Sequence, residues 1–164
     1  MSPTLNITGV HECKADAKGR VALPAALRKQ LAPVLSEGFV LKRSVFQPCL
    51  ELYPMQSWNR IMAKVNGLNR FVAKNNEFIR RFSAGVKLIE LDESGRLLLP
   101  KDLLTYASMG ANVVMAAAVD ILEIWDKAAY EKAVDPSSGD FAALAEEVMG
   151  SLRFDQSDPG HGVS

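Results

Sequence analysis

Two arginines of this chain, Arg20 and Arg96, follow the same kind of turn. Each ends an Asp-x-x-Gly-Arg sequence, and an apolar run that closes with proline follows it, over residues 16–24 and 92–100. Aspartate can accept hydrogen bonds from the backbone just after it and glycine supplies a positive φ, so each segment predicts a tight turn. A guanidinium held at such a turn could make two parallel hydrogen bonds to a phosphate or to a guanine edge.

The same spacing is also compatible with a purely structural role. Arg20 could pair with Asp16, and Arg96 with Asp92, as ion pairs that hold the turns. The sequence neighbours of Arg20 are basic and favour the nucleic-acid interpretation: Lys14, Lys18, Arg28 and Lys29. Those of Arg96 are acidic and favour the structural one: Glu90, Asp92, Glu93 and Asp102.

The repeated turn belongs to a longer internal duplication. The second segment follows the first by 76 residues, and Leu50-Glu51-Leu52-Tyr53 returns later as Leu122-Glu123-Ile124-Trp125. Echoes in the same order at nearly the same offset indicate one supersecondary unit used twice.

Each copy predicts a strand, a turn, a second strand, a short helix and a hairpin. The apolar run after each arginine suits a short buried strand. Pro24 and Pro100 stand where a helix can begin. The hairpin strands are expected over residues 39–43 with 49–53, and 112–117 with 121–125.

Three further segments show helical spacing of apolar residues. They are 55–65 and 71–82, which are separated at Asn66-Gly67, and the weaker 141–152. From Asp155 onward the chain is polar and predicts a frayed end. The predicted organisation is a first repeat over 5–53, a helical insert over 54–83, a second repeat over 84–134, and a C-terminal helix and tail over 135–164. The two repeats are expected to share one core.

Composition and motifs argue against several classes of protein. No apolar stretch is long enough to span a bilayer, and no secretory signal opens the chain, so we expect a cytoplasmic protein without a membrane partner. The motifs of serine hydrolases, zinc proteases and phosphate-binding loops are absent, so we expect neither an enzyme nor a cofactor. Cys13 and Cys49 suit buried structural thiols, and His11 and His161 are too few for a metal site.

A net charge of zero hides a strong asymmetry between the two halves. Residues 1–89 hold 14 basic and 5 acidic residues, a net charge of +9, whereas residues 90–164 carry −9. Such segregation suggests that the basic half meets an anion and the acidic half something basic. Mutual neutralisation within one fold is the simpler alternative, and both could hold in part.

In its repeated motifs, the chain resembles the MraZ family, whose members carry two SpoVT-AbrB-type elements. The resemblance rests on the two Asp-x-x-Gly-Arg-x-x-Leu-Pro motifs, on Leu27-Arg28, on Phe78-Ile79-Arg80-Arg81-Phe82, and on residues 122–126, and it covers roughly residues 5–150. The chain departs from the family at Ile7-Thr8-Gly9-Val10, where an aromatic-Gly start is usual, and at residues 116–118, where alanines replace a glycine.

The resemblance implies a mainly β fold with short helices (α+β), a duplicated swapped-hairpin, double-split β-barrel. It implies a bacterial regulator of transcription that binds short direct repeats in the promoter of the division and cell-wall gene cluster, and therefore associates with the nucleoid. It also implies ring-shaped homo-oligomers. The family's Asp-x-x-x-Arg motifs contact DNA, which makes the candidate DNA-binding residues Lys14, Asp16, Lys18, Gly19, Arg20, Arg28, Asp92 and Arg96.

Two hypotheses of different classes follow. The first is a sequence-specific DNA-binding regulator. The second is a protein-interaction module of the same fold, antitoxin-like or a scaffold, in which the arginines serve the fold. For assembly, two halves of opposite charge favour a head-to-tail contact, which can close into a ring. Trp58 and Phe71 are candidate apolar contacts between subunits, although packing in the core is an equal possibility for each.

Overall fold

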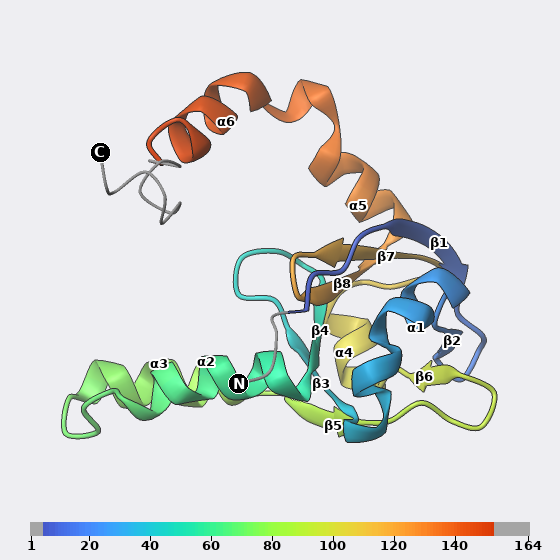
Figure 1. The fold of residues 1–164 in the computed structure, drawn as a ribbon, viewed down its shortest axis with the longest axis horizontal. Coiled ribbons are helices and arrows are strands. Elements are labelled where there is room, and N and C mark those ends of the chain that lie inside the picture. The colour runs from blue at the N-terminus through green and yellow to red at the C-terminus, as the bar shows by residue number, and fades with distance from the viewer. Residues whose placement is uncertain (1–4, 153–164) are drawn as a thin grey trace, which may run out of the picture. The chain divides into compact units, whose positions relative to one another are not determined.

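The computed structural model describes residues 5–152, and the chain divides into two compact units, Met1–Tyr130 and Glu131–Ser164 (Figure 1). The first unit contains all of the strands in the described residues. The first copy supplies β1 (Val10–Lys14), β2 (Arg20–Ala22), β3 (Phe39–Arg43) and β4 (Leu50–Pro54). The second copy supplies β5 (Lys87–Ile89), β6 (Arg96–Leu98), β7 (Asn112–Ala118) and β8 (Ile121–Asp126).

Six strands form one antiparallel sheet in which the two copies exchange strands. The order is β1-β7-β8-β4-β3-β5, with β4 and β8 paired at the centre. The first strand of each copy therefore pairs with the hairpin of the other: β1 with β7, and β5 with β3. The predicted mainly β, α+β class is confirmed. The sheet has two edges, β1 and β5, so it is open and not a closed barrel.

The remaining two strands, β2 and β6, form an antiparallel ribbon across the two copies (Figure 1). Backbone hydrogen bonds extend it at both ends: the Leu99 N–H donates to the Gly19 carbonyl (2.8 Å) and the Leu23 N–H to the Gly95 carbonyl (3.0 Å). Each turn glycine therefore bonds to the strand of the opposite copy. This exchange of the two turn hairpins agrees with the swapped-hairpin architecture that the resemblance implies.

Short helices pack against this β structure. α1 (Ala25–Leu31) follows Pro24, continues into the 3-10 helix Ala32–Glu37, and has its counterpart in α4 (Lys101–Tyr106), which follows Pro100. Because Leu27, Leu31 and Leu103 are fully buried, both helices seal one shared core. Its central side chains come from both copies: Val21, Leu27, Phe39, Leu41, Leu52, Leu97, Leu103, Met115, Leu122 and Ile124.

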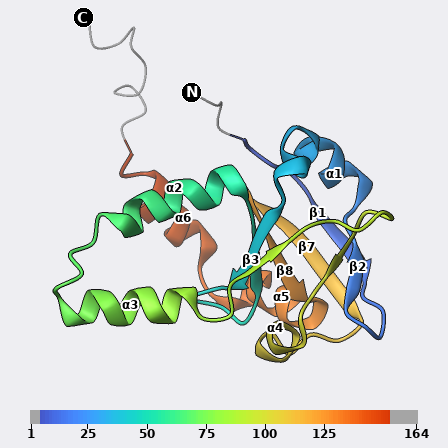
Figure 2. The same ribbon diagram turned by 90° about the horizontal axis from the view of Figure 1, so that it is seen from below.

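The predicted helical insert is an antiparallel pair. α2 (Met55–Asn66) and α3 (Ala73–Ser83) run in opposite directions, as Figure 2 shows, and their bounds agree with prediction within two residues. Trp58 of α2 stacks on Phe82 of α3 (ring centroids 5.9 Å apart) and meets the edge of Tyr53 (5.5 Å). Trp58 therefore belongs to the packing of the fold, whereas Phe71, between the helices, is 98% exposed.

The second copy also ends in helices. α5 (Lys127–Val134) directly follows β8, and the second unit then contains the short 3-10 helix Pro136–Ser138 and α6 (Phe141–Met149). The Asp140 side chain caps α6 by accepting from the Ala143 N–H (3.1 Å). The helix predicted over 141–152 is thus confirmed in its main part. The tail predicted from Asp155, together with His161, lies outside the described residues.

Candidate nucleic-acid interface

The first turn is held by a single carboxylate. One Asp16 oxygen accepts the backbone N–H groups of Lys18 and Arg20 (both 2.9 Å), and the other accepts Nε of Arg20 (2.7 Å). Gly19 lies between them at φ +85°, where a side chain would also collide with the backbone carbonyl of Leu99. The residue types that predicted the turn are therefore the ones that build it.

The second turn repeats this arrangement almost atom for atom. One Asp92 oxygen accepts the N–H groups of Ser94 (2.8 Å) and Arg96 (2.9 Å), and the other accepts Nε of Arg96 (2.9 Å). Both arginine side chains are 36% exposed and both aspartates 39%. The ion pairs give no geometric reason for assigning different roles to the two arginines.

A structural role and a binding role are compatible in these arginines. In the described residues, each guanidinium bonds to its aspartate through Nε, and about a third of each arginine side chain is exposed. The backbone N–H of the arginine, followed by smaller contributions that include its side chain, holds the pKa of Asp16, and likewise of Asp92, below the ordinary value. Each carboxylate therefore stays ionised at neutral pH. It orients the guanidinium of its arginine through the bond to Nε.

Strand register brings both arginines to one exposed face. Arg20 lies opposite Leu98, and Ala22 lies opposite Arg96. Directly opposed residues share a face and alternate residues return to it, so these four side chains lie on the same side of the ribbon. Val21 and Leu97 point to the other side and are fully buried. A two-stranded ribbon of this kind fits the major groove of B-form DNA.

Two residues of this face, Ala22 and Leu98, were not among the predicted site residues. The apolar runs predicted fully buried strands, but only the middle residue of each strand is buried, and Leu98 is 55% exposed. The alternation was hidden because alanine and leucine stand where a half-exposed strand usually has polar residues. The duplication could have revealed it, since it predicts that the positions two after Arg20 and Arg96 are equivalent.

The exchange of hairpins moves Arg28 away from its expected place. Sequence proximity placed Arg28 with Arg20, but the Arg28 guanidinium lies against Gly95, in the second turn. Leu104 occupies the equivalent position beside Gly19. A basic group from the first copy therefore supplements the turn that is rich in acidic residues. Sequence reasoning could not find this, because the contact depends on the pairing of β2 with β6.

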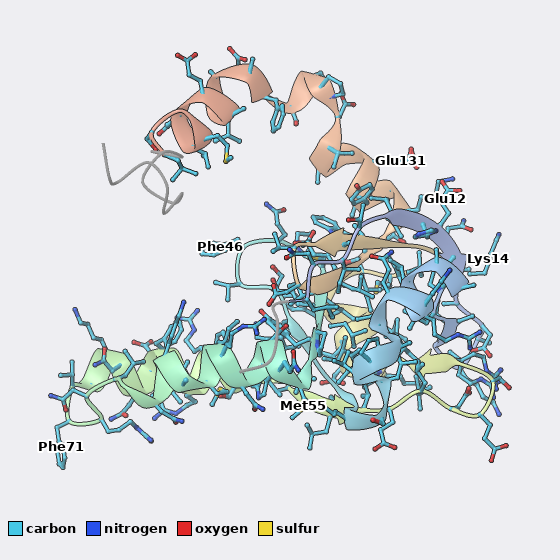
Figure 3. The ribbon with its side chains drawn as sticks, in the orientation of Figure 1. Glu12, Lys14, Phe46, Met55, Phe71 and Glu131 are labelled. Carbon is cyan, nitrogen blue, oxygen red and sulfur yellow. The ribbon has the colours of Figure 1, made fainter. Side chains whose placement is uncertain are left out.

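The predicted lysines remain near the first turn. Lys18 is exposed within it, and Lys14 is exposed on β1, where its side chain points away from the strand (Figure 3). The candidate surface thus combines Lys14, Lys18 and Arg20 around the first turn with Arg28 and Arg96 around the second. Arg20 and Arg96 come from the ribbon itself and Lys18 from its first turn, whereas Lys14 comes from β1 and Arg28 from α1.

Other functional features are few in the part of the chain that the structure describes. Cys49 is buried, which raises the pKa of its thiol to about 12, and Cys13 is half-buried. Residues 5–152 include no group of three or more His, Cys, Asp and Glu side chains placed to hold a metal ion. Among the described helices, none is long and apolar enough to cross a bilayer.

Comparison with known proteins gives the chain its relatives. It matches the family described as "MraZ protein, putative antitoxin-like" twice, over residues 7–81 and 82–151. It is 59% identical over 151 residues to the transcriptional regulator MraZ of Christiangramia forsetii, covering 92% of this chain and 97% of that protein. The protein of the same name from Flavobacterium psychrophilum is 62% identical over 150 residues (92% and 96%), and that from Cytophaga hutchinsonii 36% over 142 residues (87% and 93%).

These matches confirm the resemblance in both copies and agree with the expectation that the chain is not an enzyme. The chain belongs to the MraZ family of transcriptional regulators.

Proposed function

We propose that this protein is a sequence-specific DNA-binding regulator that reads DNA with the β2–β6 ribbon. The observation that carries the proposal is the placement of Arg20 and Arg96 on one exposed face of that ribbon, each oriented by its own aspartate. A planar fork fixed in this way suits the O6 and N7 atoms of guanine. Lys14, Lys18 and Arg28 surround the face and suit phosphates.

The proposed target is a set of short direct repeats in a promoter, that of the division and cell-wall gene cluster. This part of the proposal rests on the family. It is supported by the shape of the ribbon, whose two ends are similar in backbone but differ in their side chains, with Ala22 at one end and Leu98 at the other. A ribbon whose two ends differ binds DNA in one orientation. Several copies arranged in a ring would therefore match direct repeats and not a palindrome. A cytoplasmic protein associated with the nucleoid fits this role.

The proposed assembly is a head-to-tail ring. Two ion pairs, Arg60–Asp120 (3.0 Å) and Lys87–Asp102 (3.7 Å), link cations of the basic half to anions of the acidic half in the described residues. They neutralise only a small part of the two opposite charges of nine. A heterologous contact sets the basic half of one copy against the acidic half of the next, and such contacts can close into a ring.

The test is binding to the promoter of the protein's own gene, compared with scrambled DNA of the same length, across a salt series. A regulator that neutralises several phosphates must lose affinity steeply as salt rises, while its preference for the promoter remains. Equal affinity for promoter and scrambled DNA would instead favour the alternative, an interaction module of this fold whose arginines only hold the turns.

A further inference from the structure

The helix α6 carries an apolar stripe along one face. Phe141, Leu144 and Val148 are 75%, 52% and 55% exposed, and they stand at positions i, i+3 and i+7. Met149 and Leu152 extend the same stripe and are about half exposed. Isolated apolar residues at a surface need no explanation, but a continuous stripe along one helix marks a surface that binds a partner.

The internal duplication indicates what kind of helix α6 is. At an offset of 70 residues, the apolar positions of the α3 segment, Phe71, Phe78, Ile79 and Phe82, coincide with those of the α6 segment, Phe141, Val148, Met149 and Leu152. The counterpart of the Tyr53–Trp58 ring pair is also present, as Trp125 with Tyr130 (centroids 5.8 Å apart). α6 is therefore the second copy's version of a helix that packs through its apolar side.

A groove in the first unit has the complementary character. It has a volume of about 540 Å³ and lies between α3, the β3–β4 loop and α4. Phe78, Phe82 and Tyr106 give it aromatic walls, and Phe78 is 46% exposed. Val45, from the β3–β4 loop, lines it and is 56% exposed; Phe46, next along that loop, is 89% exposed and projects outward (Figure 3).

The rim of this groove is basic, whereas α6 is acidic. Lys74 and Arg81 stand exposed along it, and Arg43 lies over the Tyr106 ring, 5.2 Å from its centroid. Glu77 is the single acidic lining residue. On α6, the exposed Glu146 and Glu147 lie on the polar face, away from the apolar stripe. An amphipathic helix binds a groove by laying its apolar face into it, and here the helix is acidic and the rim of the groove is basic.

We propose that α6 of one copy binds in this groove of the next copy. The inference rests on the proposed head-to-tail assembly and names its contact: an acidic helix on one side and a basic aromatic groove on the other. The two surfaces are different, so each copy offers one of each and the contact can repeat from copy to copy around a ring. Apolar burial supplies the affinity, and the charges select the partner and make assembly sensitive to salt.

The first experiment compares two valine substitutions in the full chain by light scattering. Val148→Asp places a charge in the stripe, and we expect it to convert rings into monomers. Val119→Asp is the matched control: Val119 is 70% exposed in the β7–β8 turn at φ +65°, which aspartate tolerates, and it should leave the ring intact. Rings of unchanged mass in Val148→Asp would overturn the α6 contact but leave head-to-tail assembly standing. A monomeric unmodified protein would overturn both.

The second experiment mixes complementary variants. The double reversal Lys74→Glu with Arg81→Glu should also give monomers, because it turns the basic rim acidic without touching the aromatic walls. Mixed with Val148→Asp, it should form one-to-one dimers of twice the monomer mass, since one intact α6 then meets one intact groove. Melting curves check that both variants fold. A mixture that stays monomeric would overturn the proposal. Binding of α6 to the groove of its own chain would give this same result.

Discussion

The two turns of this protein share a backbone and differ in what lies around them. Asp16 and Asp92 organise the same hydrogen bonds, and Arg20 and Arg96 have the same exposure. The environment differs: Leu104 lies beside the first turn, and Arg28 beside the second. Duplication has thus kept the geometry that aims the arginine, while the flanking residues have diverged. Differences in function between the copies should therefore follow from the neighbours of each turn and not from the turns themselves.

The largest effect is expected from removing the arginines. Arg20→Ala should leave the protein folded and weaken promoter binding by about 1–3 kcal/mol for each contacting subunit. Several subunits on one promoter multiply the loss, because linked sites act at high effective concentration. Arg96→Ala should weaken binding less, since Glu93 and Asp102 outweigh the one positive charge that Arg28 brings to the second turn. Fluorescence anisotropy with promoter DNA measures both. Equal losses would show that the copies act symmetrically.

The two turn glycines should differ in their tolerance of a side chain. Gly19→Ala and Gly95→Ala both place alanine at positive φ, which costs about 1–2 kcal/mol. At Gly19 the new methyl group also meets the backbone carbonyl of Leu99, whereas at Gly95 it meets only the mobile end of Arg28. We expect Gly19→Ala to lower the free energy of unfolding further, by about 1–3 kcal/mol. Urea denaturation of the two variants decides it, and a larger loss in Gly95→Ala would contradict the account.

The third difference concerns the apolar residues of the ribbon face. On the proposed DNA-binding face we expect the exposed Leu98 to contact a thymine methyl group, and burial of one methyl contributes about 0.8 kcal/mol, or about fourfold in affinity. Leu98→Ala should lose this amount, and the promoter with deoxyuridine in place of thymidine should lose it only with the unmodified protein. An unchanged response to deoxyuridine in Leu98→Ala would show that the methyl group is read elsewhere, or by Ala22.

The smallest effect is expected from acid. The pKa values of Asp16 and Asp92 are lowered in the folded protein from a reference of 3.8. The stability that these carboxylates contribute is therefore present above about pH 4 and is lost as pH falls through their folded pKa values. Melting temperatures of the double variant Asp16→Asn with Asp92→Asn should lie below those of the unmodified protein at pH 7 and converge with them at lower pH. A gap that widens in acid would exclude this origin.

Much of this fold could be predicted from the sequence, because neighbouring residues in the chain determine it. Turn chemistry located Asp16 to Arg20 and its copy, and apolar periodicity located β3, β4, β7, β8 and the helices α2 and α3. The duplication implied two equivalent units. These features depend on neighbours within a few residues, where backbone propensity and side-chain hydrogen bonding decide the structure.

The exchange between the copies could not be predicted in detail. Nothing local specifies that β1 pairs with β7 instead of β3, or that Arg28 reaches Gly95. The buried Lys42, held by Glu51 at 3.7 Å and placed over the Phe82 ring, was likewise invisible, because its partners come from β4 and α3. The placement of Arg20 and Arg96 on one shared face was missed for the same reason. It depends on the register between two strands that are 76 residues apart.

The claim that the ribbon arginines read bases is tested most directly by replacing both with lysine. Arg20→Lys with Arg96→Lys keeps the charge but removes the planar fork. We expect its affinity for scrambled DNA to stay nearly unchanged while its affinity for the promoter falls to the same level, so that the ratio of the two affinities approaches one. A ratio equal to that of the unmodified protein would contradict the claim, because charge alone would then account for the binding.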